Sequence, residues 1–175
     1  MDHKNWIAIL DFGSQVTQLI ARRIREQNIY CEILRFDVDV NELIKRNPKG
    51  IILSGGPCSV TEENSPQCHN DLFTLNIPIL GICYGLQLTA IKLNANVKAG
   101  KKHEYGKAQM RIIDKSPLFA DISNSIQVWM SHGDKVETIP ENFKIIAESD
   151  NCPIAAIANE KEKIYGVQFL SLIHI

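Results

Sequence analysis

The sequence predicts an α/β fold built on an open, mostly parallel sheet. In the first half, short apolar runs with no polar face alternate with stretches that are apolar on one helical face. Glycines follow several of these runs, and beyond residue 107 the rhythm changes to closely spaced apolar runs. No linker rich in Pro, Gly or Ser divides the 175 residues, so we expect a single domain.

The first half begins with Trp-Ile-Ala-Ile-Leu-Asp at residues 6–11, which is typical of a strand buried on both faces. Val16, Leu19, Ile20 and Ile24 then recur at helical spacing. The same alternation predicts strands at 30–34, 50–54 and 77–82, and helices at 40–45 and about 84–93. This order implies right-handed crossovers between parallel strands.

The second half contains apolar runs separated by short turns, with little helix between them. We expect strands at 108–113, 126–130, 144–147, 154–158 and 165–169. These strands should extend the central sheet.

Composition and charge exclude several classes of protein. The 19 basic and 20 acidic residues leave a net charge of −1, which offers nothing to attract a nucleic acid. No apolar run approaches the roughly 18 residues of a membrane span, and the N-terminus lacks a signal-peptide core. The five cysteines include no C-x-x-C pair, so we expect neither a disulfide framework nor a metal site. These features predict a cytoplasmic protein.

The residues Gly-Ile-Cys-Tyr-Gly at 81–85 are the sharpest chemical signal. They place Cys83 on the turn between a strand and a helix, which is the position of a nucleophile elbow. The flanking glycines leave room for a tight turn, and the helix N-terminus should lower the pKa of the thiol. The NH of Tyr84 should point at a developing oxyanion. The alternative is a buried cysteine beside two packing glycines.

Ser-Gly-Gly-Pro at residues 54–57 ends the neighbouring strand. In an open α/β sheet, ligands bind outside the carboxyl ends of the strands, so the NH of Gly56 can offer a second oxyanion donor. A plain tight turn is the alternative. The chemical interpretation requires an accessible Cys83 sulfur beside this turn.

These motifs resemble the class-I (triad) glutamine amidotransferase family. The resemblance rests on Ser-Gly-Gly-Pro, Gly-Ile-Cys-Tyr-Gly-Leu-Gln and Gly-Val-Gln-Phe, in that order. Further stretches at 9–15, 17–23, 104–108 and 128–134 are similar to the amidotransferase domain at the N-terminal end of GMP synthases. The resemblance covers residues 5–169 and implies a flavodoxin-like arrangement of the sheet.

The resemblance implies hydrolysis of glutamine to glutamate and ammonia. Cys83 would attack the side-chain amide and form a thioester, while the NH groups of Gly56 and Tyr84 stabilise the oxyanion. Gln87 would help to hold glutamine, although it could also be an exposed helix residue.

The backbone around Ser131, Gly133 and Asp134 would hold glutamine together with Gln87. The alternative for this Ser-His-Gly-Asp stretch is a capped turn without a role in binding.

The family's partners and cofactors lie outside such a domain. The resemblance implies transfer of ammonia to a synthetase domain or subunit that binds ATP, magnesium and XMP, and no cofactor in this domain. The phosphate loop of that synthetase is absent from this sequence, because Ser54 begins the only Ser-Gly-Gly and Pro57 follows it. Residues 104–108, with Lys101 and Lys102, are candidates for the docking surface.

The sequence departs from the family after Phe169. Family members continue with His-Pro-Glu, whose His and Glu complete the triad, whereas Leu170 and Leu172 stand here. We expect neither to move a proton, and the chain as written should be a defective glutaminase. Other histidines are poor substitutes: His3, His69, His103, His132 and His174. Residues 170–175 match the translation of a sequencing adapter, so we interpret them as a non-family tail and expect the natural gene to continue after Phe169.

Two other functions stay open. One is the glutaminase subunit of another amidotransferase, such as the anthranilate synthase type, against which the stretches at 11–15 and 129–134 weigh. The other is a non-catalytic glutamine-binding module, which Leu170 and Leu172 favour.

Overall fold

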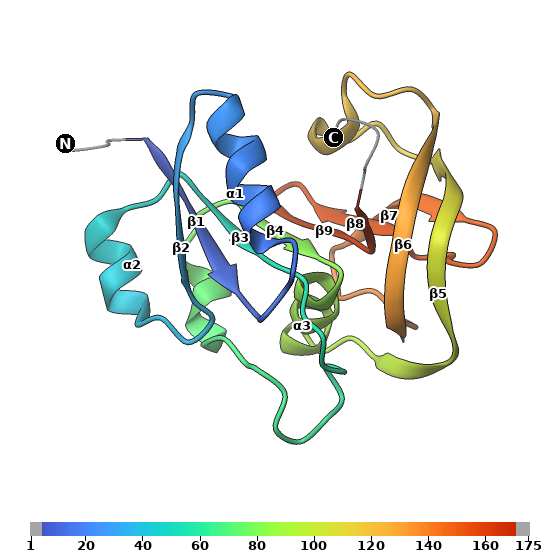
Figure 1. Ribbon diagram of the computed structural model, residues 1–175, viewed down its shortest axis with the longest axis horizontal. Helices are drawn as coiled ribbons and strands as arrows, with labels where there is room; N and C mark the ends of the chain where they lie inside the picture. Colours follow the sequence, from blue (N-terminus) through green and yellow to red (C-terminus); the bar gives the residue numbers. More distant parts are fainter. Residues whose placement is uncertain (1–4, 171–175) are drawn as a thin grey trace.

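Strands and helices alternate through the first half of the chain in the computed structural model, which describes residues 5–170 and, at 101–104, the backbone alone (Figure 1). These elements are β1 (Trp6–Asp11), α1 (Thr17–Glu26), β2 (Tyr30–Arg35), α2 (Val40–Arg46), β3 (Gly50–Leu53), η1 (Asn70–Thr74), β4 (Ile79–Ile82) and α3 (Tyr84–Lys92). Every strand and helix predicted for this half is present. The strand predicted from residue 77 begins at Ile79 because Pro78 has no NH to donate to a ladder.

The parallel part of the sheet is buried on both faces at its inner strands β1, β3 and β4, whereas its edge strand β2 is partly exposed. Its strands lie in the order β2-β1-β3-β4, a flavodoxin-like arrangement. Successive residues of β1 point to opposite faces: Ile9 packs with Ala21 of α1, whereas Leu10 packs in a cluster with Leu43 of α2 and Leu88 of α3. This two-sided burial explains why the strands carry no polar face and confirms the α/β class.

The second half extends the same sheet with antiparallel strands. The elements are β5 (Val97–Ile112), η2 (Pro117–Phe119), β6 (Ser125–Val136), β7 (Lys144–Ser149), β8 (Ala156–Asn159), β9 (Ile164–Val167) and β10 (Phe169–Leu170). The full order is β10-β6-β5-β7-β8-β9-β4-β3-β1-β2, in which β9 pairs parallel to β4. The predicted extension of the sheet is therefore present.

The pair β5 and β6 is longer than the sequence predicted. Both strands reach well beyond the runs at 108–113 and 126–130, and they form the long hairpin that projects on the right of Figure 1. Main-chain pairing holds this hairpin together, so its residues need no apolar pattern. For the same reason the Ser-His-Gly-Asp stretch at 131–134 is strand, so the alternative of a capped turn there is wrong.

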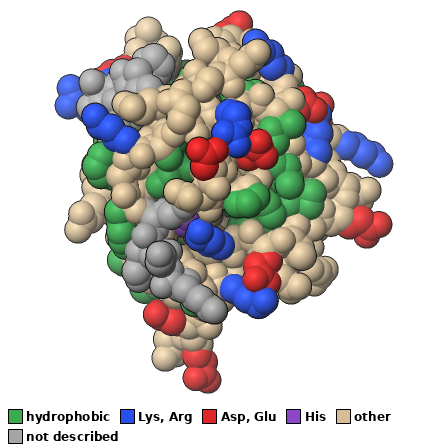
Figure 2. All heavy atoms as spheres, turned by 90° about the vertical axis from the view of Figure 1, so that its right-hand side faces the viewer, with side chains coloured by type: hydrophobic (Ala, Val, Ile, Leu, Met, Phe, Trp, Pro, Cys, Tyr) green, Lys and Arg blue, Asp and Glu red, His purple; other side chains and the backbone are tan. Residues whose placement is uncertain are grey.

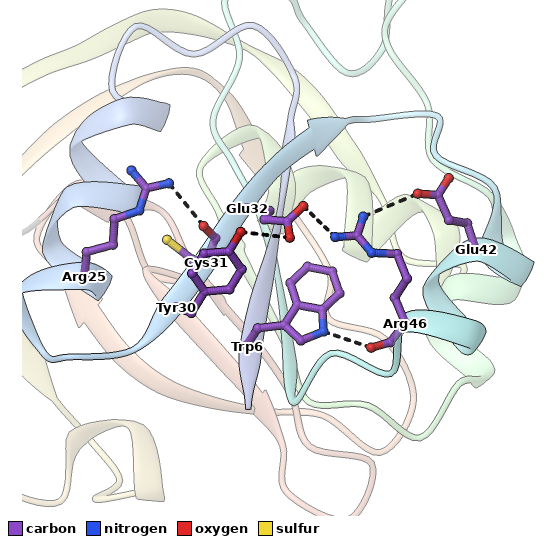
Figure 3. A network of polar contacts seen from close by, with 7 residues as sticks. All are labelled: Trp6, Arg25, Tyr30, Cys31, Glu32, Glu42 and Arg46. Atoms are coloured by element: carbon purple, nitrogen blue, oxygen red, sulfur yellow. Dashed lines mark hydrogen bonds and ion pairs between the residues drawn. The ribbon is translucent and has the colours of Figure 1, made fainter. Parts of the chain in front are cut away.

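A polar network fastens the edge strand β2 to α2 (Figure 3). Arg46 contacts Glu32 at 2.5 Å and Glu42 at 3.3 Å, and its guanidinium lies 4.5 Å from the Trp6 ring centroid. Trp6 Nε1 in turn donates to the Arg46 carbonyl at 2.9 Å. Trp6 begins β1, so the network stabilises the end of the sheet opposite the carboxyl ends of the parallel strands. Among residues 5–170, no helix is long and apolar enough to cross a membrane.

Candidate active site

Cys83 lies on a strained turn between β4 and α3. Its φ of 49° and ψ of −104° belong to a region that non-glycine residues rarely adopt. Two hydrogen bonds hold this conformation: the Cys83 NH donates to the Val167 carbonyl at 2.7 Å, and the Cys83 carbonyl accepts from the Gln87 NH at 3.1 Å. The strand–turn–helix placement predicted for the nucleophile is therefore confirmed.

The glycines on either side of Cys83 are required by close backbone contacts. A Cβ on Gly81 would lie 2.6 Å from the Gly85 backbone, and a Cβ on Gly85 would lie 2.3 Å from the Leu53 carbonyl oxygen. The steric reason inferred from the sequence is thus correct. The glycines let α3 begin directly against β3.

The two NH groups predicted to form an oxyanion hole belong to Gly56 and Tyr84, which are in close contact. A Cβ on Gly56 would lie 3.3 Å from Tyr84 Cγ and 2.9 Å from the Phe12 carbonyl oxygen. The Tyr84 ring is fixed by Phe12, with 5.3 Å between ring centroids, and by its OH, which donates to the Pro66 carbonyl. Within the described chain, neither NH has a hydrogen-bond acceptor. Both are available to a ligand.

One cavity of about 290 Å³ brings all of the predicted site residues together. Its lining includes Gly56, Cys83, Tyr84, Gln87, Ser131, Gly133 and Asp134. His132, interpreted from the sequence as a pocket residue and not as a base, also lines this cavity. The sequence reasoning missed other residues of its wall: Pro57, Cys58, Ser59, Glu62 and Tyr105. The segment 57–62 directly follows the diglycine turn, a signal that could have found it. Tyr105 reaches the cavity through pairing with Ser131, which no local pattern reveals.

Gln87 is not an exposed helix residue. Its side chain is 3% exposed, and Nε2 donates to the Asp134 carbonyl at 3.1 Å and to Gln168 Oε1 at 3.3 Å. The Asp134 carbonyl also contacts His132 Nδ1 at 3.1 Å. These contacts fix the Gln87 amide at the cavity wall.

The Asp134 carboxylate holds the loop that follows the diglycine turn. Its Oδ2 accepts from Ser59 Oγ at 2.7 Å and from the Val60 NH at 2.9 Å. Asp134 is 6% exposed. Its carboxylate therefore ties β6 to the opposite wall of the cavity.

A second cavity, of about 220 Å³, lies on another side of Cys83. It shares Gly56, Pro57, Cys83 and Ser131 with the first cavity and adds Leu170. The side chain at the position of the family's histidine thus borders the same space as the sulfur. Cys83 is 8% exposed, yet it lines both cavities, so the required access beside the diglycine turn exists.

The prediction of a lowered thiol pKa was wrong. Burial raises the pKa of the Cys83 thiol from 9.0 to about 12, and the neighbouring Cys152 adds to the rise. That is a factor of about 1,000 in the ionisation constant. A helix N-terminus contributes at most about 2 kcal/mol, or a factor of about 30, so the dipole of α3 is too weak to offset desolvation. The thiol at rest is protonated.

Of the remaining residues singled out in the sequence, some lie in the described part of the chain and others lie outside it. His69 is exposed, as expected, and the described residues contain no group of three or more His, Cys, Asp or Glu side chains that could hold a metal ion. The side chains of Lys101, Lys102, His103 and Glu104 and the whole of His3, Leu172 and His174 lie outside the described part.

Comparison with known proteins gives the same family as the motifs. The profile described as glutamine amidotransferase class-I matches residues 8–169. The GMP synthase (glutamine-hydrolysing) of Clostridium novyi is 53% identical over 163 residues, which are 93% of this chain and 32% of that protein. The corresponding enzyme of Ruthia magnifica is 54% identical over 171 residues, 95% of this chain and 33% of that protein.

The fold comparison agrees. A solved structure from Thermoplasma acidophilum, described as that of a GMP synthase subunit, superposes with a TM-score of 0.84 at 30% identity and covers 93% of this chain and 82% of that one. The chain spans about a third of the length of the curated relatives it matches. With the strained Cys83 turn, the diglycine corner and the shared cavity in place, the chain belongs to the class-I glutamine amidotransferase family and corresponds to the amidotransferase part of GMP synthases.

Proposed function

We propose that the cavity of about 290 Å³ binds glutamine and presents its side-chain amide to Cys83. The observation that carries this proposal is that the proposed nucleophile Cys83, the two proposed oxyanion residues Gly56 and Tyr84, and Gln87 all line one cavity. Gln87, Ser131, Gly133 and Asp134 surround the substrate, which the fixed Gln87 amide and the strand backbone orient.

In the proposed reaction the Cys83 sulfur adds to the amide carbon of glutamine. The NH groups of Gly56 and Tyr84 donate to the oxygen of the tetrahedral adduct. The carbon–nitrogen bond then breaks, ammonia leaves, and water hydrolyses the thioester to glutamate and the free thiol. The reaction requires a group that takes the thiol proton and gives one to the leaving nitrogen.

The described chain supplies no such group at residue 170. Leu170 cannot transfer a proton, and at pH 7 only about one Cys83 in 10⁵ is a thiolate. We therefore propose that this chain binds glutamine but turns it over very slowly.

In the longer relatives we propose a role as ammonia supplier. Ammonia would pass to a synthetase part that uses ATP and magnesium to convert XMP to GMP, while the amidotransferase part itself needs no cofactor. The relatives named above are GMP synthases, which supports this assignment over an anthranilate synthase type.

The proposal is tested by alkylation with a chloromethyl ketone analogue of glutamine. We expect mass spectrometry to find one adduct on Cys83, and an excess of glutamine to slow its formation. Cys58→Ser is the matched control, because Cys58 lines the same cavity and its loss should leave labelling unchanged. Labelling that ignores glutamine, or that shifts to another cysteine, would contradict the proposal.

A second candidate function, glutamine binding without chemistry, is favoured by Leu170 alone. Calorimetry with glutamine on Cys83→Ser measures the binding that both candidates require. Single-turnover release of ammonia from the unaltered chain separates them, because only the first candidate yields one ammonia per Cys83.

A further inference from the structure

A large cavity of the described chain lies along one edge of β5. It has a volume of about 630 Å³, and five consecutive β5 residues, 105–109, form one wall. Met130 and Lys135 of β6 and residues 149–151, at the end of β7, complete it. A wall of consecutive strand residues indicates that the cavity runs along the strand's main chain.

The pairing of β5 leaves this edge open. β6 pairs with β5 from Glu104 to Arg111 on one side, whereas β7 pairs only with residues 110–112 on the other side. No other described strand reaches residues 105–109. We call the open edge of residues 105–109 the β5 edge.

Hydrogen bonds on either side of β5 show which peptide groups face this edge. The Ile112 NH donates to Asn124 on the β6 side, and the Ile113 NH donates to Ile146 on the β7 side. Since peptide groups alternate along a strand, the NH and carbonyl groups of Lys107 and Gln109 point away from β6 into the open cavity. Those of Ala108 point toward β6.

The face of the hairpin beside this edge is exposed and continuous with the active site. Tyr105 is 67% exposed and Trp129 is 38% exposed. Tyr105 pairs with Ser131 and Leu170 pairs with Trp129, so these side chains share the face on which Ser131 and Leu170 border the cavities at Cys83. Figure 2, which looks at this side of the molecule, shows hydrophobic side chains exposed among charged ones.

We propose that the β5 edge accepts an extended segment of the synthetase part as an additional strand, by β-augmentation. This inference rests on the proposed function, because it assumes that the remaining two thirds of the relatives' length forms the partner. Main-chain groups of Lys107 and Gln109 hold the added strand, and Tyr105 contacts its side chains.

The position of β10 supports this occupant. Leu170 pairs with Trp129, and Trp129 pairs with Lys107 on its other side. Two strand spacings, about 10 Å, therefore separate β10 from the β5 edge. In relatives that continue after this point, the chain resumes across the hairpin, about two strand spacings from β5, and this short distance gives the added strand a high effective concentration.

Amide exchange, resolved by residue with NMR, tests the proposal. The comparison is between the 175-residue chain and a chimera in which residues 1–169 precede the remaining part of the Clostridium novyi enzyme. We expect the amides of Lys107 and Gln109 to exchange at least about tenfold more slowly in the chimera. Ala108 and Met110 are internal controls, because their amides point to β6 and should be slow in both proteins.

A pair of variants separates main-chain pairing from side-chain contact. In the chimera, Lys107→Pro removes the outward NH and should abolish protection of the Gln109 amide, whereas Lys107→Ala should retain it. Thermal unfolding of both variants reports whether the hairpin is intact. Proline that leaves the Gln109 protection unchanged in an intact hairpin would overturn the proposal.

Three further outcomes would also overturn it. Equal exchange in both proteins means that no segment occupies the edge. Protection in the isolated chain that grows with concentration identifies a second copy, and protection that disappears on truncation after Leu170 identifies the chain's own tail. Labelling of Cys83 by the glutamine analogue in the same chimera reports the proposed function separately.

Discussion

The two cavities that meet at Cys83 differ in what they offer a reaction. The larger one contains the complete set of groups predicted to bind glutamine and stabilise an oxyanion, held by backbone geometry and by the Asp134 contacts. The smaller one is lined by Leu170, at the position where the family resemblance predicts the histidine that transfers protons. The difference teaches that the groups predicted for substrate binding and the position predicted for proton transfer belong to separate segments of this fold, so one set can change while the other stays intact.

The largest expected effect comes from supplying the missing groups. The double variant Leu170→His with Leu172→Glu places an imidazole at the cavity that Cys83 lines and restores the glutamate that the family resemblance predicts two residues later. We expect the rate of ammonia release from glutamine to rise about 10²- to 10⁴-fold, as measured by a coupled glutamate dehydrogenase assay. Leu172→Glu alone is the control and should give no increase. An inactive double variant that still binds glutamine would show that the smaller cavity is not the site of proton transfer.

The elbow itself is tested by two alanines at neighbouring glycines. Gly85→Ala places a Cβ 2.3 Å from the Leu53 carbonyl, and we expect it to destabilise the fold by about 3 kcal/mol or more. Gly55→Ala is the matched control, since its Cβ would lie 3.5 Å from Ser14 Oγ and 3.9 Å from Cys83 Cβ, which is ordinary contact. Urea unfolding monitored by circular dichroism should separate them. Equal midpoints would contradict the steric account.

The raised pKa of Cys83 predicts how its reactivity depends on pH. Only the thiolate reacts with iodoacetamide, and the folded-state pKa of about 12 lies above the ordinary value of 9.0. The alkylation rate should therefore rise about tenfold per pH unit through pH 9 to 10, where a free cysteine derivative already levels off.

The same pKa predicts an effect on stability. Because the folded state holds the Cys83 proton more tightly than the unfolded chain, this contribution is present below pH 9 and is lost as pH rises toward 12. In the alkylation experiment described above, a plateau of the Cys83 rate below pH 9 would mean that a nearby group, and not burial, sets the pKa of the thiol.

How much the sequence could predict differs between the two halves of the sheet. In the parallel half, the inner strands are buried on both faces and glycines lie at the turns that follow them, so local patterns located β1, β3, β4 and Cys83. In the antiparallel half, the hairpin of β5 and β6 is held by cross-strand pairing. No local pattern could show that Tyr105 would reach the cavity opposite Ser131.

The thiol pKa failed as a prediction for a different reason. The helix position of Cys83 is a local property that the motif reveals, whereas desolvation depends on neighbours such as Cys152, which is 69 residues away in the chain. Local electrostatics was therefore visible in the sequence, and the opposing effect of burial was not.

The smallest expected effect concerns the wall of the larger cavity. Asp134→Asn keeps the size of the side chain but removes the charge that accepts from Ser59 and Val60, so we expect a loss of about 1–2 kcal/mol in the free energy of unfolding. Asp150→Asn is the control: its carboxylate is 82% exposed and pairs with Arg111 at the surface, so the change should stay within about 0.5 kcal/mol. The glutamine analogue should also label Cys83 more slowly in Asp134→Asn, because the loop at 59–60 loses its tie to β6. If labelling slows without any loss of stability, the Asp134 carboxylate contacts the substrate directly. The shape of the larger cavity would then not depend on the contacts of Asp134 with Ser59 and Val60.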